Sequence, residues 1–341
     1  MNSPYGMAEL RPVQCVSEDT VRCHVAGCTV EVPRQRQHFR VREEYLCPVH
    51  GIYLSPSTFQ YRDRYRNLLW CDDEDRHCLR TMESVKRTME RLGRERDEDA
   101  LGWNVTRAFE REGRLRVLAG LLTGEDHSGL PRGEPQAIYW ATDTSGGGRW
   151  GRLKQAQGQF EEVPNRGTEP DVALYWPGQH LVFVEAKFCA PNRTTPSAKP
   201  EEEDPRPRTY GEHMHFARVF TACYHQIAVR SKLYQLMRLW LLGSWLAEDE
   251  DARFHLVNLV RWQDERDVED RFASRYCCQL PGRHFRRATW ESIWDALPAS
   301  GLSDQSVLTL GGYLANKSCG YDGDGRLQRA FIPREKRPAQ P

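Results

Sequence analysis

Residues 169–188 read EPDVALYWPGQHLVFVEAKF, and this stretch decides how we interpret the rest of the chain. The runs VALYW and LVFV are rich in apolar, β-branched and aromatic residues, which is typical of buried strands. The Pro-Gly pair between them suits a type II turn, so the stretch predicts a β-hairpin. Its ends carry Asp171, Glu185 and Lys187. Charged groups at the ends of core strands cost several kcal/mol unless they are paired or bound to a metal.

The three charged residues predict a site for a divalent cation. Residues two apart in a strand share a face, so Glu185 and Lys187 project together, and a paired strand that begins at Asp171 brings a second carboxylate beside them. Two such carboxylates suit Mg²⁺ or Mn²⁺. The ammonium can orient or help to deprotonate a metal-bound water and offset charge on a phosphate. The residues therefore favour phosphodiester hydrolysis, and the alternative is an ion pair that serves only the fold.

The composition limits the class of protein. The chain has 341 residues, and its 48 Lys and Arg balance its 48 Asp and Glu. This length favours two or three domains, and the neutral total argues against a histone-like, charge-only binder. No apolar stretch is long enough to span a bilayer, and residues 1–15 lack the apolar core of a secretory signal, so we expect a cytoplasmic protein and no membrane partner. Its 11 cysteines then point to metal binding or buried thiols rather than disulfides.

The pattern along the chain predicts an α/β protein with a mixed sheet flanked by helices, preceded by a small metal-binding module. The predicted regions are a zinc-ribbon-like module at 1–72, a linker helix at 73–94, a core at 95–300 and a C-terminal extension at 301–341. Within the core, residues 190–211 are rich in Pro and charge and lack periodicity, which predicts a flexible loop.

The hairpin residues resemble a known nuclease motif. Pro170-Asp171, with Glu185-Ala186-Lys187 beginning fourteen positions after Asp171, resembles the core motif of the PD-(D/E)xK nuclease superfamily. With ExxALxWNVxRAF upstream and YQL downstream, the chain also resembles bacterial restriction-endonuclease-like proteins that carry an N-terminal zinc-binding module. The resemblance covers roughly residues 95–262. It implies a restriction-endonuclease-like core, with an acidic residue on a preceding helix and a helix that crosses the sheet after the hairpin.

The resemblance also assigns roles to residues outside the charged hairpin. It implies that Glu98 is the first acidic metal ligand, with Asp97 and Asp99 as rivals. Gln235, in LYQLMR, resembles a helix residue that positions metal-bound water or the lysine, and the Ala186 carbonyl resembles a further ligand. The alternatives are a helix N-terminal acid favoured by the helix dipole for Glu98 and an ordinary surface amide for Gln235.

A cysteine and histidine cluster near the N-terminus predicts a structural zinc site. Residues 23–50 contain Cys-x₄-Cys and Cys-x₂-His knuckles, a Cys₃His set that tetrahedral zinc accepts. The predicted ligands are Cys23, Cys28, Cys47 and His50. TVEVP and QHFRVRE between the knuckles alternate as strands do, which favours a zinc ribbon that folds through its metal. Cys15 is an alternative ligand, His24 neighbours Cys23, and a set of unrelated thiols is the other interpretation.

Arginines in and after this module are candidates for contacts with DNA, because arginine forks suit phosphates and guanine edges and the neighbouring tyrosines can stack on bases. They are Arg34, Arg36, Arg40, Arg42, Arg62, Arg64 and Arg66. A solvated charged face is the alternative for each run.

The sequence therefore predicts a Mg²⁺-dependent endonuclease that hydrolyses DNA, of restriction or defence type, with the zinc module assisting DNA binding. A non-catalytic zinc-ribbon adaptor, a repair or transposon-end nuclease and a hydrolase of other phosphate esters are the alternatives. Cleavage of both strands needs two active sites, which favours a homodimer, and a defence role implies partner proteins.

Overall fold

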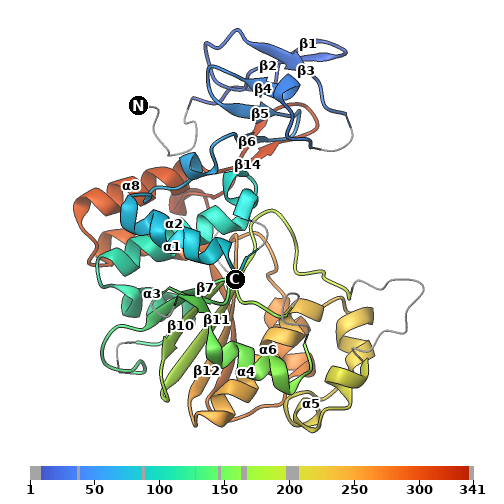
Figure 1. Cartoon of the computed structure of the whole chain (residues 1–341), viewed down its shortest axis with the longest axis vertical. Helices are drawn as coiled ribbons and strands as arrows, with labels where there is room; N and C mark the ends of the chain where they lie inside the picture. Colours follow the sequence, from blue (N-terminus) through green and yellow to red (C-terminus); the bar gives the residue numbers. More distant parts are fainter. Residues whose placement is uncertain are drawn as a thin grey trace. The chain divides into compact units, whose positions relative to one another are not determined.

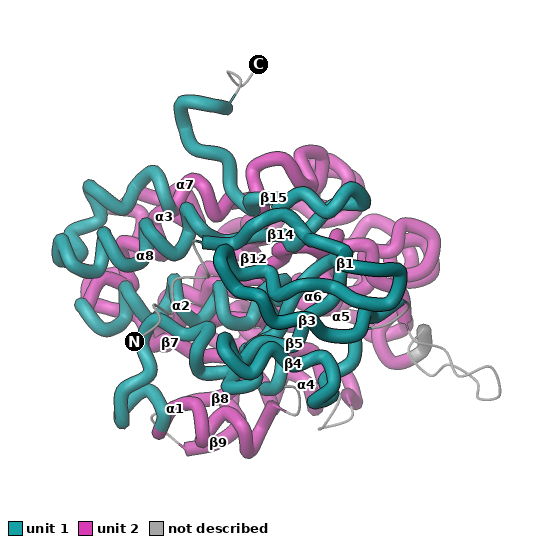
Figure 2. Tube along the Cα trace, turned by 90° about the horizontal axis from the view of Figure 1, so that it is seen from above, with its two compact units in different colours: residues 1–76, 87–112, 294–341 teal, residues 77–86, 113–293 magenta. Residues whose placement is uncertain are grey.

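The computed structural model describes residues 9–36, 39–86, 89–126, 128–144, 147–162, 167–196 and 207–337. The chain divides into two compact units, which Figure 2 colours separately. Unit 1 comprises residues 1–76, 87–112 and 294–341, and unit 2 comprises residues 77–86 and 113–293. The helices α1 (Asp73–Glu83) and α7 (Trp290–Ala296) each contain one of the four points where the chain passes from one unit to the other.

Unit 2 is built on a seven-stranded mixed sheet with the order β13-β12-β11-β10-β7-β8-β9. The strands are β7 (Gln136–Tyr139), β8 (Thr142–Asp143), β9 (Gly148–Arg149), β10 (Val172–Trp176), β11 (His180–Ala186), β12 (Arg253–Val260) and β13 (Arg283–Thr289). β11, β12 and β13 are parallel, and the remaining neighbours are antiparallel. Figure 1 shows β7, β10, β11 and β12 next to one another. Every residue of β10 and β11 is buried, including the polar residues His180 and Glu185 of β11.

Helices cover both faces of this sheet. The α-helices of unit 2 are α3 (Leu115–Thr123), α4 (Gly151–Gln159), α5 (Met214–Val219) and α6 (Tyr234–Asp249), with π-helical turns at Pro207–Gly211, His225–Arg230 and Glu269–Ser274. α6 packs on β11 and β12, where Trp240 shares a core with Phe183 and Phe254. A Cβ on Gly243 would lie 2.1 Å from the Phe254 ring, so a glycine lets α6 approach the sheet. α3 contacts β12 and β13 from the opposite face (Figure 1).

The β10–β11 hairpin has the predicted turn. Gly178 has a φ of +63°, the left-handed conformation that position i+2 of a type II turn requires. The Gln179 N–H donates to the Trp176 carbonyl at 3.0 Å and closes the turn. The strands then pair in register from Trp176↔His180 to Val172↔Val184.

Unit 1 contains two three-stranded antiparallel sheets and a C-terminal hairpin. The strands are β1 (Cys15–Ser17), β2 (Thr20–Arg22), β3 (Glu31–Pro33), β4 (Leu46–Cys47), β5 (Ile52–Leu54), β6 (Phe59–Tyr61), β14 (Ser318–Tyr321) and β15 (Leu327–Arg329). Its α-helices are α2 (Glu98–Arg111) and α8 (Asp304–Asn316), with 3₁₀ turns at Glu43–Tyr45, Arg64–Asn67, Met89–Gly93, Leu297–Ala299 and Arg334–Lys336. Glu95 and Lys317 form a fully buried ion pair at 3.1 Å and join the C-terminal segment to the rest of the unit.

Several local predictions are confirmed. The structure has the mixed sheet flanked by helices, the hairpin and a Cys/His cluster near the N-terminus. The expected strand over QHFRVRE is wrong for its described part, because residues 39–42 are irregular and a 3₁₀ turn begins at Glu43. The Gln35 side chain accepts from the Arg40 N–H at 2.6 Å and donates to the Arg40 carbonyl at 3.1 Å. These bonds engage the backbone groups of Arg40 that a strand ladder would use.

The predicted flexible loop at 190–211 lies partly outside the described residues, and its last five residues form a π-helical turn. The zinc-module segment and the C-terminal extension both fall in unit 1, together with residues 87–112. The proposed boundaries near 72, 94 and 300 stay predictions. No described helix has the length and apolarity needed to cross a membrane.

Candidate functional site

The Cys/His cluster lies where two knuckles of unit 1 meet. Cys23 directly follows β2, and Cys28 lies in the turn before β3. Cys47 ends β4, and His50 lies in the following turn to β5. The ligand atoms of all four residues lie within 4.8 Å of one another. The local turns fix this arrangement, since the Gly51 N–H donates to the Cys47 carbonyl at 2.8 Å.

The distances within the cluster fit a tetrahedral metal. Zn–S bonds of about 2.3 Å and Zn–N bonds of about 2.05 Å at tetrahedral angles separate two sulfurs by about 3.8 Å and a sulfur from a nitrogen by about 3.6 Å. The Cys28 and Cys47 Sγ atoms are 3.8 Å apart, and the His50 Nδ1 atom is 3.5 Å from the Sγ atoms of both Cys23 and Cys47. Three sulfurs and one imidazole nitrogen form a donor set that zinc accepts, so the cluster could hold a structural zinc ion.

The charge state of the cluster depends on whether a metal is bound. Burial raises the pKa of the Cys23 and Cys47 thiols, because desolvation disfavours the charged thiolate. A bound zinc ion would supply compensating positive charge and deprotonate its sulfur ligands. Four protein ligands leave no open coordination position, as expected for a structural site.

The alternative ligands considered from the sequence lie outside this cluster. Cys15 is exposed on β1. His24 is buried, and its ring packs edge-on against Tyr321 with the centroids 4.5 Å apart. Burial lowers the pKa of His24 to about 3, so this imidazole is neutral and belongs to the core.

The other candidate site is the end of the β10–β11 hairpin in unit 2. Its charged side chains contact each other and the neighbouring backbone directly. The Lys187 Nζ atom lies 2.5 Å from Glu185 Oε1. The Asp171 Oδ2 atom accepts a hydrogen bond from the Ala186 N–H at 2.8 Å. The side chain of Glu185 is 3% exposed and that of Lys187 14%, so the ion pair is largely removed from water. The three predicted residues therefore come together within a few residues of one strand end.

The register places these groups on one face of the sheet. Val172 pairs with Val184, so one further position sets Asp171 opposite Glu185. Glu185 and Lys187 alternate with Ala186 and share the face of Phe183, which α6 covers. The backbone of Lys187 is fixed from two sides. Its N–H donates to the Leu259 carbonyl at 2.8 Å, and its carbonyl accepts from Trp290 Nε1 at 3.1 Å.

Two buried amides next to Glu185 were not predicted. Asn258 on β12 is the register partner of Glu185, and its side-chain nitrogen donates to the Glu185 carbonyl at 3.3 Å. Asn192 donates to the Asn258 side-chain oxygen at 2.7 Å. Both amides are at most 1% exposed. The sequence signal was the single amide inside the apolar strand RFHLVNLV, since a buried polar residue in a core strand needs a partner.

The other residues predicted for the hydrolytic site lie at helix termini. Glu98 is the first residue of α2 in unit 1 and is half-buried. Asp97 is the N-cap and accepts from the Asp99 N–H, so its carboxylate serves the helix start. Gln235 is the second residue of α6, the helix that covers the Glu185 face, and its N–H donates to Thr194 Oγ1 at 2.9 Å. Glu98 thus belongs to a different unit from Asp171, Glu185 and Gln235.

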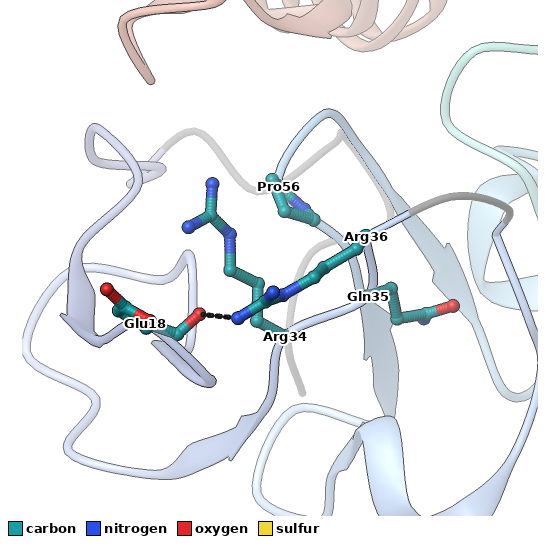
Figure 3. A pocket seen from close by; sticks show the side chains of 5 residues that line it. All are labelled: Glu18, Arg34, Gln35, Arg36 and Pro56. Carbon is teal, nitrogen blue, oxygen red and sulfur yellow. Dashed lines mark hydrogen bonds between the residues drawn. The ribbon is translucent and has the colours of Figure 1, made fainter.

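Two of the predicted arginines line a pocket of about 570 Å³ in unit 1 (Figure 3). Arg34 and Arg36 extend into it from the segment after β3, near Glu18 and Pro56. The Arg36 guanidinium is 2.6 Å from Asp19 and donates to the Glu18 carbonyl at 3.3 Å. No salt bridge of the described residues holds Arg34.

The other predicted arginines divide into surface and structural groups. They are Arg40, Arg42, Arg62, Arg64 and Arg66. The first three are exposed, and Arg62 faces Glu43 at 3.4 Å. Arg64 donates to the Tyr65 hydroxyl at 3.2 Å. Arg66 donates to the carbonyl of His50 at 2.6 Å and so supports the second knuckle. Arg64 and Arg66 are therefore less available to a ligand than the exposed arginines.

Comparisons with models of protein families, with curated proteins and with solved structures find no match for this chain. The two candidate sites must therefore be interpreted from their own geometry. Unit 1 offers a closed cluster of sulfur and nitrogen ligands, and unit 2 offers a pair of carboxylates beside an ammonium.

Proposed function

We propose that the chain is a divalent-metal-dependent endonuclease with a PD-(D/E)xK, restriction-endonuclease-like core that hydrolyses DNA phosphodiester bonds. The observation that carries this proposal is the hairpin end, where Asp171 directly precedes β10 and Glu185 and Lys187 lie at the end of β11, with the Glu185–Lys187 pair largely buried. A pair of this kind contributes little to stability compared with apolar packing, which favours a functional reason for its presence.

The residues fit a hard cation. Asp171, Glu185 and the Ala186 carbonyl would hold Mg²⁺ or Mn²⁺, since all three offer oxygen ligands. The cation would supply a Lewis acid that lowers the pKa of bound water and offsets charge on the phosphate. Lys187 orients the attacking water and places positive charge near the scissile phosphate. Asn258 fixes the Glu185 backbone through its 3.3 Å hydrogen bond and keeps the carboxylate in position.

The remaining assignments follow the same proposal. Gln235 would position water or Lys187, and the role of Glu98 as an acidic metal ligand stays a prediction from the resemblance. The zinc module, with Arg34 and Arg36 at its pocket, would help to hold DNA. A cytoplasmic restriction or defence enzyme that acts as a homodimer, with defence partner proteins, is the biological setting that we favour.

Plasmid cleavage tests this proposal. Purified protein is incubated with supercoiled plasmid in Mg²⁺ or Mn²⁺, alongside the Asp171→Asn variant and a Glu169→Gln control. Glu169 pairs with Arg149 at 2.9 Å, so this change removes a carboxylate near Asp171 without touching the candidate metal ligands. We expect nicking or linearisation that needs the metal and is lost only in Asp171→Asn.

Cleavage that persists in Asp171→Asn contradicts the assignment of the site. A zinc-loaded protein that binds DNA but cleaves neither unmodified, methylated nor phage DNA would instead be a non-catalytic adaptor. Cleavage of small phosphate esters without cleavage of DNA would indicate a different hydrolase.

A further inference from the structure

Unit 1 contains a pocket of about 340 Å³ between β6 and the segment that leads into α2. The residues that line it include Phe39, Thr58, Gln60, Arg94, Arg96 and Asp97. Its walls are joined by backbone contacts, because Gln60 and Arg94 form an antiparallel bridge and the Glu95 N–H donates to the Phe59 carbonyl at 3.3 Å. The volume lies in the range of pockets that take small ligands.

Two polar atoms of the lining lack hydrogen-bond partners among the described residues. Gln60 is 7% exposed, and its Oε1 atom accepts no hydrogen bond from the described residues. The Thr58 Oγ1 atom is likewise buried and unpaired there. A buried carboxamide oxygen without a donor costs free energy, and rotation of the Gln60 side chain into the pocket would let a ligand N–H group recover it.

The other lining residues combine an aromatic surface with positive charge. Phe39 is half-buried, and Arg94 and Arg96 are exposed. Aromatic rings stack on nucleobases, and arginine forks bind phosphate oxygens. The Asp97 carboxylate also lines the pocket, and its charge disfavours a dianionic terminal phosphate more than a singly charged phosphodiester.

We propose that this pocket binds one unpaired nucleotide. The base stacks on Phe39 and donates an N–H of its Watson–Crick edge to Gln60 Oε1, while Arg94 and Arg96 hold the adjacent phosphate. Every nucleobase has such an N–H, so the site selects an extruded or single-stranded nucleotide rather than one base. Under the proposed nuclease function, on which this part of the inference rests, the nucleotide belongs to the DNA strand. A free nucleotide is the other source.

Fluorescence titration of the full-length Asp171→Asn protein tests the pocket without cleavage. The probes are a short single-stranded oligonucleotide with one 2-aminopurine, AMP, ribose 5-phosphate and inorganic phosphate, the last three as competitors. Phe39→Ala, Gln60→Met, Arg94→Ala and Arg96→Ala are compared with Arg326→Ala. Arg326 is an exposed arginine at the β14–β15 turn of the same unit, paired with Asp324 at 3.4 Å.

We expect the oligonucleotide to bind with a change in 2-aminopurine fluorescence, and AMP to compete better than ribose 5-phosphate or phosphate. Loss of stacking in Phe39→Ala should weaken binding about tenfold or more. Gln60→Met and the arginine variants should weaken it severalfold, and Arg326→Ala should leave it unchanged. AMP that binds as tightly as the oligonucleotide would support the pocket and identify a free nucleotide as its ligand.

Binding that is equal in all four pocket variants overturns the proposal, as does the absence of binding by every probe. Because Arg94 and Arg96 are exposed, their variants keep the test valid even if a change at Gln60 prevents folding. The result is separable from the nuclease assay. Metal-dependent plasmid cleavage with unaltered pocket variants would reject only the pocket, and nucleotide binding by a protein that cleaves nothing would reject only the nuclease.

Discussion

In the Cys/His cluster of unit 1, four soft ligand atoms converge on one point with the separations of a closed tetrahedron. At the end of the β10–β11 hairpin in unit 2, the acidic groups instead bind the protein itself, Glu185 through Lys187 and Asp171 through the Ala186 N–H. The first arrangement has no position left for a substrate. The second uses hard oxygen atoms, and their partners include the Lys187 ammonium and the Ala186 N–H. The comparison shows two differences between a candidate structural metal site and a candidate catalytic site. They differ in the type of ligand atom and in whether protein ligands fill every coordination position.

The largest expected effect comes from breaking the closed cluster. Cys47→Ser removes one of three sulfur ligands, and zinc binding to such sites contributes roughly 10–16 kcal/mol to folding. We expect zinc content measured by inductively coupled plasma mass spectrometry to fall from one ion per chain to none, with loss of the near-ultraviolet circular dichroism of the module. Cys15→Ser is the matched control, because Cys15 is exposed and lies outside the cluster. A zinc-loaded, folded Cys47→Ser protein would contradict the ligand set.

Breaking the hairpin pair should have a smaller effect on stability and a complete effect on the proposed activity. Removing one member of a fully buried ion pair costs roughly 3–5 kcal/mol, and we expect Glu185→Gln to lie at the low end because Lys187 is 14% exposed. The double variant Glu185→Gln/Lys187→Met removes the unpaired charge. Urea unfolding should therefore show its stability restored, whereas plasmid cleavage should be absent from both variants. Cleavage by the double variant would show that the pair is only structural.

The sequence was sufficient where the relevant contacts are local. The turn at Gly178 and the pairing of Asp171 with the Glu185 strand follow from a short hairpin whose turn sets the register. The cluster of Cys23, Cys28, Cys47 and His50 was predictable from the knuckle spacing, although the sequence left Cys15 open as an alternative ligand. The error over QHFRVRE arose because the Gln35 side chain binds the backbone of Arg40, and alternation of residue types carries no information about such a bond.

Contacts between distant segments were not predictable. Asn258 lies beside Glu185 only because β12 pairs in parallel with β11 after a long intervening segment. The pocket at Gln60 needs β6 and the residues before α2 to come together, and nothing in either segment alone indicates it.

The opposite face of the hairpin sheet provides a pH-dependent prediction. His180 Nε2 and His255 Nδ1 are hydrogen-bonded at 2.8 Å, and burial lowers the pKa of His180 to about 4 and that of His255 to about 2. The folded state therefore binds fewer protons than the unfolded state below pH 6.5. Stability is fully present above this pH and falls by several kcal/mol as the pH drops through 4 towards 2. Urea unfolding at several pH values measures this loss.

The control variants separate this histidine pair from other titrating groups. His255→Gln should flatten the dependence between pH 6.5 and 4, while the exposed His225→Gln should leave it unchanged. An equal slope in His255→Gln and the parent protein would mean that other groups, such as Glu125 at 3.6 Å from His255, control the acid response.

The smallest expected effect distinguishes two arginines of the zinc module. Arg34 lines the pocket of Figure 3, whereas Arg66 donates to the carbonyl of His50, a member of the Cys/His cluster. Arg34→Ala should leave the unfolding free energy unchanged and lower the slope of log affinity for DNA against log salt by about 1, the effect of one lost phosphate contact. Arg66→Ala should instead lower stability by about 1 kcal/mol through the lost hydrogen bond. Salt-dependent fluorescence anisotropy and urea unfolding of both variants measure the contrast. A salt slope that changes in Arg66→Ala and stays the same in Arg34→Ala would contradict this assignment. It would place the phosphate contact at the second knuckle rather than at the pocket.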